Sequence, residues 1–305
     1  MERRTFLKNA SLAGAGTIPA VSALSNPNSM TEAGKPFNMN YAFHDGMFSA
    51  HAGDNFIDQI KFAHGHGFRS IEDNGMMGRT PEMQSRIGET LAKLGMQMGV
   101  FVITSNGWHW SMSLATGKKE FNDLIVKDCK VAVEVAKRTN AKWMTVVPGN
   151  FDRSLPMDIQ TANVIDGLRR GAEILEKHGL VMVLEPLSDN PDLFLRFSTQ
   201  TYMICKAVNS SACKILFDMY HMQKNEGNII KNIDLTWDEI GYFQIGDNPG
   251  RNEPTTGEMN YKNIFKHIHT KGFKGILGME HGNSLPGKEG ELALIKAYRD
   301  SDAFL

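Results

Sequence analysis

The segment HGLVMVLEP, residues 178–186, passes from a glycine through an unbroken apolar run to Glu185 and a proline. A strand that buries residues 181–184 carries the next side chain to the edge of the same core, where an unpaired carboxylate is costly or shifts its pKa. Two weaker versions of the phrase occur, HGFRSIE (66–72) and KGFKGILGME (271–280). Each contains a helix end, a glycine C-cap, a strand and a carboxylate. The sequence therefore predicts a repeated helix–strand unit with acidic strand ends.

After residue 36, short apolar segments alternate eight times with longer segments of helical period. The expected strands are Phe37–Phe43, Phe68–Glu72, Gln97–Ile103, Trp143–Val147, Val181–Glu185, Lys214–Asp218, Tyr242–Ile245 and Gly275–Glu280. The expected helices lie near residues 54–65, 80–94, 119–138, 158–178, 199–208, 228–233, 260–270 and 289–300.

The alternation predicts a parallel sheet, because its strands are almost continuously apolar and so are buried on both faces. Eight rounds in about 270 residues favour closure into a (β/α)8 TIM barrel, an α/β fold, as a single domain over residues 31–305. An open doubly wound sheet is the alternative. No G-x-G-x-x-G motif follows any expected strand, which argues against it.

The first 30 residues are predicted to be an export signal and linker rather than part of the fold. MERRTFLKNASLAGAGTIPAVSALS (1–25) has an arginine pair, a weakly apolar run and a small-residue cleavage site in that order, and it resembles a twin-arginine signal. We therefore expect export to the periplasm; a frayed cytoplasmic N-terminus is the alternative. No other apolar run approaches the ~20 residues that cross a bilayer, so no membrane span is expected.

Charge and cysteine content exclude several classes of partner. The formal net charge is −1, and loss of the signal, with a local charge of +2, leaves about −3. This balance gives no electrostatic footprint for nucleic acid. Cys129, Cys205 and Cys213 lack the paired spacing of a zinc site. Buried free thiols are expected, although an oxidising compartment permits a Cys205–Cys213 bridge.

Four oxygen-bearing side chains are expected at one rim of the barrel, where the carboxyl ends of the strands meet. They are Glu185, Asp218, Gln244 and Glu280. Three carboxylates this close raise one another's pKa unless a cation holds them. All-oxygen ligation suits Mn²⁺ or Mg²⁺ better than Zn²⁺. The alternative is that these carboxylates cap neighbouring helices. Glu72 and His44, at the ends of two other strands, are expected to form a satisfied polar layer.

Four motifs resemble the xylose-isomerase-like barrels, in particular hydroxypyruvate isomerases and ketose 3-epimerases. They are LEPL (184–187), FDMYHMQ (217–223), QIGDNPGRNEPTTGEMNY (244–261) and GMEHG (278–282). The resemblance implies a divalent metal held by the four rim residues, with Glu185 and Glu280 as the acid/base pair. It makes His221 and Arg251 candidates for substrate binding. Trp108, after the third expected strand, is a further candidate because an aromatic face packs on a sugar.

The chemistry implied is proton removal next to a carbonyl, through an enediolate stabilised by the metal. The first hypothesis is a metal-dependent aldose–ketose isomerase of the hydroxypyruvate isomerase type, acting on a small hydroxy-ketone, keto acid or sugar. Alternatives are a ketose 3-epimerase, a metal-dependent phosphodiesterase and a non-catalytic sugar-binding barrel. The loop TSNGWHWSMSLATGKKE (104–120) differs from that of hydroxypyruvate isomerases, so the sequence does not identify the substrate. The sequence also leaves open whether the protein forms a homo-oligomer.

Overall fold

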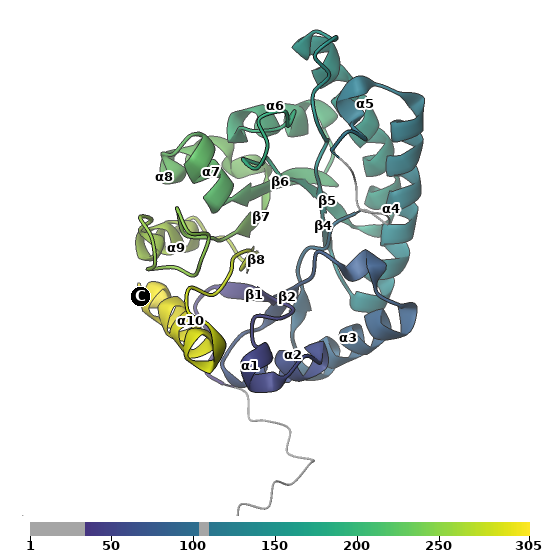
Figure 1. Cartoon of the computed structure of the whole chain (residues 1–305). Helices are drawn as coiled ribbons and strands as arrows, with labels where there is room; N and C mark the ends of the chain where they lie inside the picture. Colours follow the sequence, from purple (N-terminus) through teal and green to yellow (C-terminus); the bar gives the residue numbers. More distant parts are fainter. Residues whose placement is uncertain (1–33, 104–109) are drawn as a thin grey trace, which may run out of the picture. The chain divides into compact units, whose positions relative to one another are not determined.

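The computed structural model describes residues 34–103 and 110–305. The predicted export signal at residues 1–30 lies outside this part of the chain. Eight parallel strands form the centre, and helices surround them (Figure 1). The strands are β1 Asn40–His44, β2 Ser70–Glu72, β3 Gln97–Met98, β4 Trp143–Val146, β5 Val181–Leu184, β6 Cys213–Asp218, β7 Ile240–Gln244 and β8 Ile276–Gly278. All eight expected strands are therefore present.

The strand order β3-β2-β1-β8-β7-β6-β5-β4 is that of a barrel, and the fold prediction is confirmed. Strand β8 pairs with β1, which joins the two ends of the chain in one sheet. The remaining seam, between β3 and β4, is bridged by Val102 and Thr145. Here Thr145 donates its N–H to Phe101 O at 2.8 Å and accepts from Ile103 N–H at 3.1 Å.

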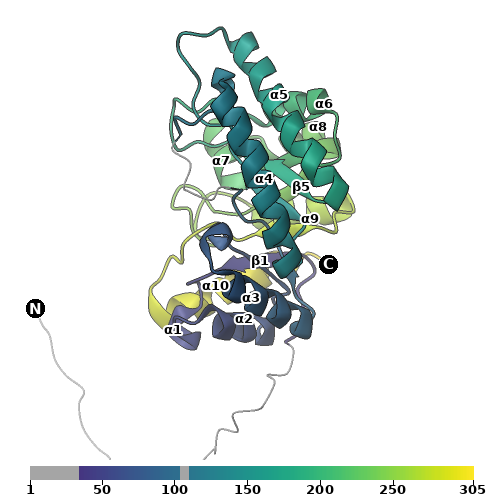
Figure 2. The ribbon, with the colours of Figure 1, turned by 90° about the vertical axis from the view of Figure 1, so that its right-hand side faces the viewer.

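Ten α-helices occur in the described residues, two more than expected. They are α1 Ser49–Ala52, α2 Phe56–Gly65, α3 Pro81–Leu94, α4 Lys119–Thr139, α5 Met157–Leu175, α6 Ser198–Val208, α7 Met219–Asn225, α8 Ile229–Thr236, α9 Tyr261–Thr270 and α10 Gly287–Asp302. Helices α4 and α5 lie side by side (Figure 2). The additional elements, α1 and α7, are too short to show a helical period in the sequence.

The helix–strand repeat in the opening segment depends on a glycine. Gly179 has a φ of 65°, in the left-handed region, and it ends the short 3₁₀ turn that follows α5. Its backbone N–H then donates to Glu176 O at 3.0 Å. A residue with a Cβ is strained in this conformation, so glycine turns the chain directly into β5.

Two groups of buried apolar side chains account for the two faces of the strands. The larger packs between the sheet and the helices. The smaller fills the barrel interior and draws five members from strands and one from the segment after β3: Ala42, Val183, Leu216, Tyr242, Ile276 and Val100. This division explains the apolar strand sequences, because both faces of each strand are covered.

The described residues also bear on two further expectations, the absence of a membrane span and the state of the cysteines. No helix among them is both long enough and apolar enough to cross a membrane. Cys129, Cys205 and Cys213 are all buried and free, so the Cys205–Cys213 bridge is not formed. Burial raises the pKa of the Cys129 thiol to about 12, which leaves it unreactive at neutral pH.

Candidate active site

The carboxyl ends of four successive strands bring the predicted side chains to one rim. Asp218 is the last residue of β6 and Gln244 the last of β7, and the two are register partners. Glu185 directly follows β5, and Glu280 lies two residues beyond β8. The four residues therefore belong to neighbouring strands of one sheet.

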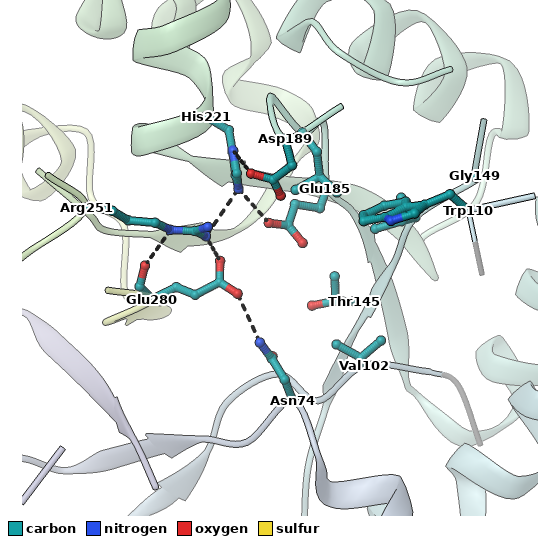
Figure 3. Close-up of a pocket in the computed structure, with 12 residues that line it drawn as sticks. Asn74, Val102, Trp110, Thr145, Gly149, Glu185, Asp189, His221, Arg251 and Glu280 are labelled. Atoms are coloured by element: carbon teal, nitrogen blue, oxygen red, sulfur yellow. Dashed lines mark hydrogen bonds and ion pairs between the residues drawn. The ribbon is translucent and has the colours of Figure 1, made fainter. Parts of the chain in front are cut away.

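Three carboxylates and one imidazole form a compact cluster at this rim. One ligand atom from each of Glu185, Asp218, His221 and Glu280 lies within 4.8 Å of the other three. The first three residues are buried and Glu280 is partly buried. Figure 3 shows Glu185, His221 and Glu280 directed toward one another around a pocket. The structure thus assembles groups that are up to 95 residues apart in the chain.

Burial shifts the pKa of every carboxylate in the cluster upward, and repulsion from neighbouring carboxylates adds to this shift for Glu185 and Glu280. Burial, followed by the charges of Glu280 and Asp218, raises the pKa of Glu185 well above its usual value. Burial also raises the pKa of Asp218, against the opposing charge of Arg251. Burial and the charge of Asp218 raise the pKa of Glu280. A cation among these groups would favour the ionised form of all three carboxylates and so oppose these shifts.

The two oxygens of Asp218 have different surroundings. Oδ1 accepts hydrogen bonds from the backbone N–H groups of Tyr220 at 2.7 Å and His221 at 3.2 Å, which caps α7. Oδ2 is buried and has no hydrogen-bond partner. The helix-capping alternative is therefore correct for one oxygen of this carboxylate, while the other is free to bind a ligand.

A polar layer beneath the cluster holds Gln244. Glu72 is fully buried and accepts from Gln244 Nε2 at 2.8 Å and from the Tyr242 hydroxyl at 2.7 Å. His44 Nε2 lies 2.8 Å from the same carboxylate. The expectation that Glu72 and His44 belong to a satisfied polar layer is confirmed. The amide oxygen of Gln244, in contrast, is buried without a partner.

Arg251 reaches the cluster from the loop after β7. Its Nη2 donates to Glu280 Oε2 at 2.8 Å and lies 3.6 Å from Asp218 Oδ2, and its Nε donates to the backbone oxygen of Glu280 at 3.2 Å. The guanidinium carbon lies 4.8 Å from the ring centre of Tyr220, a cation–π contact. The arginine predicted to contact substrate is thus fixed beside Glu280.

His221 is held so that one ring nitrogen faces the carboxylates. The backbone N–H and the hydroxyl of Ser188 lie 3.2 and 2.8 Å from Nδ1. Nε2 then lies 3.7 Å from Asp218 Oδ2 and 3.8 Å from Glu185 Oε1. Burial and the nearby Arg251 charge lower the pKa of His221 to about 4, so the ring is neutral at pH 7.

A pocket of about 240 Å³ opens above the cluster. This volume is below the ~300–1,000 Å³ typical of drug-sized ligands, so it suits a small substrate. Glu185, His221, Arg251 and Glu280 all line it. Trp108 lies outside the described residues, but Trp110, two residues further on, does line the pocket.

Sequence reasoning missed three polar residues that line the same pocket. Asn74 donates from Nδ2 to Glu280 Oε1 at 3.0 Å. Thr145 lies in β4, and Asp189 lies in the loop after β5. Their only signal in the sequence was their position relative to the expected strands. Thr145 lies near the end of one, and Asn74 and Asp189 lie just after others. None of the three belongs to a motif.

The residues at the rim fit a divalent cation. Asp218 Oδ2 and Gln244 Oε1 are buried acceptors without partners, and the carboxylates of Glu185 and Glu280 complete an oxygen-rich set. Buried polar atoms in folded proteins are almost always paired, so two orphan acceptors at one rim indicate a missing ligand. Hard cations such as Mn²⁺ and Mg²⁺ prefer such oxygen donors.

Comparison with curated proteins finds relatives that are named as isomerases. Hydroxypyruvate isomerase of Escherichia coli (strain K12) is 31% identical over 166 residues, which are 54% of this chain and 63% of that protein. The chain therefore spans less than two thirds of that relative. 2-oxo-tetronate isomerase of Cupriavidus necator is 25% identical over 258 residues, 83% of this chain and 95% of that protein.

Solved structures share the fold at lower identity. A structure described as AP endonuclease, family 2, from Brucella melitensis matches with a TM-score of 0.73 and 21% identity, covering 85% of this chain and 99% of that one. A 3-keto-D-glucoside 4-epimerase from E. coli matches with a TM-score of 0.72 and 16% identity, covering 86% and 98%. The family model described as Xylose isomerase-like TIM barrel matches residues 60–300. Because that match spans most of the chain, the protein belongs to the xylose isomerase-like TIM barrel family.

Proposed function

We propose that this protein is an isomerase that moves a proton between adjacent carbons of a small hydroxy-carbonyl compound. The observation that carries the proposal is the convergence of Glu185 and Glu280 on one pocket, from β5 and β8. Two carboxylates on either side of a substrate carbon can remove a proton and return one. The named isomerase relatives support this reaction class.

We assign the metal ligands to Glu185, Asp218, Gln244 and Glu280, with Mn²⁺ or Mg²⁺ as the cation. When bound, such an ion supplies positive charge to the carbonyl and hydroxyl oxygens of an enediolate. The chain contributes the rest of the site. Arg251 Nη2 and His221 Nε2 lie 3.2 Å from each other, and both residues line the pocket, where they would offer polar contacts to substrate oxygens.

The two glutamates are held differently, and this difference assigns them separate tasks. Glu280 accepts from Asn74 on one oxygen and from Arg251 on the other. His221 Nε2 lies 3.8 Å from Glu185 Oε1, and no hydrogen bond among the described residues restrains this carboxylate. Two hydrogen bonds hold Glu280 in one orientation. We therefore assign proton transfer at two different carbons to these two differently held carboxylates.

The first form of the proposal is an aldose–ketose isomerase of the hydroxypyruvate isomerase type. A ketose 3-epimerase is the second candidate, because the fold is shared with a solved D-psicose 3-epimerase at a TM-score of 0.67 and 17% identity. Both reactions begin with the same proton abstraction and differ in where the proton returns. Product analysis therefore distinguishes them.

Solvent-deuterium incorporation into a panel of C3 to C6 ketoses and keto acids tests the proposal, with Mn²⁺ or Mg²⁺ supplied. We expect deuterium next to the carbonyl with the unmodified enzyme, and loss of at least ~1,000-fold in rate for Glu185→Gln and Glu280→Gln. Glu258→Gln is the matched control, because it makes the same chemical change at an exposed glutamate that does not line the pocket. Absence of exchange with every substrate would contradict the isomerase proposal and favour the non-catalytic sugar-binding alternative.

We also infer that the mature protein works outside the cytoplasm. The support is the order of arginine pair, apolar run and small residues in positions 1–25. Cell fractionation of a chain with Arg3→Lys and Arg4→Lys tests it. We expect the unmodified protein in the periplasm and the double variant in the cytoplasm; equal distribution of both would contradict export.

A further inference from the structure

The pocket has an apolar wall across from the charged cluster. Trp110, Val102, Val147 and Leu187 line it, and Trp110 is 40% exposed. In Figure 3, Trp110 lies on the opposite side of the pocket from Arg251. An aromatic ring at this place can pack on the C–H face of a carbon chain, while hydroxyl groups of the same molecule face the polar side.

Thr145 places an unpartnered hydroxyl at the same pocket. The residue is only 2% exposed, and its Oγ1 is buried without a hydrogen-bond partner. Figure 3 shows the hydroxyl directed toward the space between Glu185 and Asn74. Buried hydroxyls are nearly always paired, so this group points to a ligand that can both donate and accept.

Asp189 adds a negative charge at the entrance. Its carboxylate is 44% exposed, and the nearest cationic candidate among the described residues is His221 Nδ1 at 4.0 Å. Arg251 is the only lysine or arginine among the described lining residues, and Glu280 already holds it. Asp189 is also the most exposed of the four carboxylates in and beside the pocket. A substrate carboxylate placed next to it would therefore meet a like charge.

We propose that Thr145 and Asp189 form a hydroxyl-binding subsite that selects an uncharged polyhydroxy ketone or aldehyde over a keto acid. The Asp189 carboxylate accepts hydrogen bonds from sugar hydroxyls but repels a substrate carboxylate, and the Thr145 hydroxyl can donate to or accept from a sugar hydroxyl. The subsite would thus give this chain a different substrate preference from the keto acids after which its isomerase relatives are named. The inference rests on the proposed isomerase function.

The first test compares kcat/KM for uncharged C4 to C6 ketoses with kcat/KM for hydroxypyruvate and 2-oxo-tetronate. We expect at least a tenfold preference for an uncharged substrate. A preference for a keto acid overturns the subsite while leaving the isomerase intact. No turnover of any substrate instead contradicts the proposed function, so the two failures are distinguishable.

Asp189→Asn tests the charge. Because the variant keeps a hydrogen-bonding side chain and removes repulsion, we expect the ratio of keto-acid to ketose kcat/KM to rise about tenfold. Asp192→Asn is the matched control, since Asp192 lies in the same loop, is also 44% exposed and pairs with Arg153 away from the pocket lining. An unchanged ratio in Asp189→Asn, or an equal rise in Asp192→Asn, overturns the role of Asp189.

Thr145→Val tests the hydroxyl at constant side-chain shape. We expect kcat/KM for the preferred ketose to fall about tenfold, with little change for the deoxy analogue that lacks the contacted hydroxyl. Thr145→Ser should retain most of the activity, which separates hydroxyl loss from a packing change in β4. Equal losses for the ketose and all of its deoxy analogues overturn the assignment.

Discussion

Gln244 donates a hydrogen bond from Nε2 to Glu72 Oε1 at 2.8 Å, and this contact fixes the orientation of its amide group. An ionised carboxylate only accepts hydrogen bonds, so Glu72 selects the NH₂ end and leaves the amide oxygen unpaired. Glu72 lies at the end of β2 and contacts no other member of the proposed ligand set by a hydrogen bond among the described residues. In the proposed metal site, Glu72 would therefore act by orienting Gln244.

Glu72→Gln is expected to weaken Mn²⁺ binding by about 10–100-fold, the usual effect of losing a partner that orients a ligand. The replacement amide can present its own NH₂ to Gln244, which then turns its oxygen away from the cluster. Isothermal titration calorimetry measures the affinity. Tyr242→Phe removes a different partner of Glu72 and leaves the Gln244 contact in place, so we expect a smaller loss. Equal Mn²⁺ affinity in folded Glu72→Gln and unmodified protein would contradict this role.

Asn74→Ala is expected to lower kcat by about tenfold while KM changes little. The amide of Asn74 fixes one oxygen of Glu280, and its loss lets the carboxylate rotate away from the reacting carbon without removing a substrate contact. Steady-state kinetics separates the two parameters. Asn74→Asp should be more damaging, because it places a like charge beside Glu280. A rise in KM at constant kcat would show instead that Asn74 contacts the substrate.

The fold and the cluster of rim residues were predictable because they repeat a simple pattern. Each strand is a short apolar run, and four of them end in or just before an oxygen-bearing residue such as Glu185 or Asp218. The third strand is shorter than expected: it was predicted over 97–103, but β3 ends at Met98. Beyond it the backbone still bonds to the β2 segment, with Gly99 N–H donating to Ile71 O at 2.7 Å, and Val102 forms an isolated bridge with Thr145 of β4.

The residues that surround the substrate space were not predictable in the same way. Thr145 looks like an ordinary strand residue, and Asn74 and Asp189 look like ordinary loop residues, because no motif marks them. Their place depends on the twist of the sheet and on loop conformation, which bring chain segments over 40 residues apart to one pocket. Arg251 was identified by its motif, but its contact with Glu280 depends on the folded loop.

Gly278→Ala is expected to lower the free energy of unfolding by about 3 kcal/mol or more. A Cβ at this position would lie 1.6 Å from Glu72 Oε2, inside the polar layer. Moving Glu72 aside leaves its buried hydrogen-bond donors unpaired. Chemical denaturation measures the change. Gly78→Ala is the control, because nothing lies within 4 Å of its added Cβ. Near-equal stability of both variants would mean that the layer tolerates displacement of Glu72.

The loop that carries Arg251 depends on a buried aspartate. Arg251 has a φ of 52°, a left-handed conformation that is unfavourable for a residue with a side chain. Asp247 compensates by accepting the Arg251 N–H on its backbone oxygen at 2.7 Å. Its fully buried carboxylate also accepts from Gly257 N–H at 2.9 Å and from Met259 N–H at 3.1 Å.

Asp247→Ala is expected to cost about 1–3 kcal/mol of stability, since two partly buried backbone N–H groups lose their acceptor. Amide exchange at Gly257 and Met259 should accelerate before the barrel unfolds, because the change is local to the loop. We expect kcat/KM to fall with it, as the guanidinium of Arg251 is then no longer held at Glu280. Glu258→Ala, an exposed change in the same loop, should alter neither property. Faster exchange with unchanged kcat/KM would show that Arg251 keeps its position without this loop.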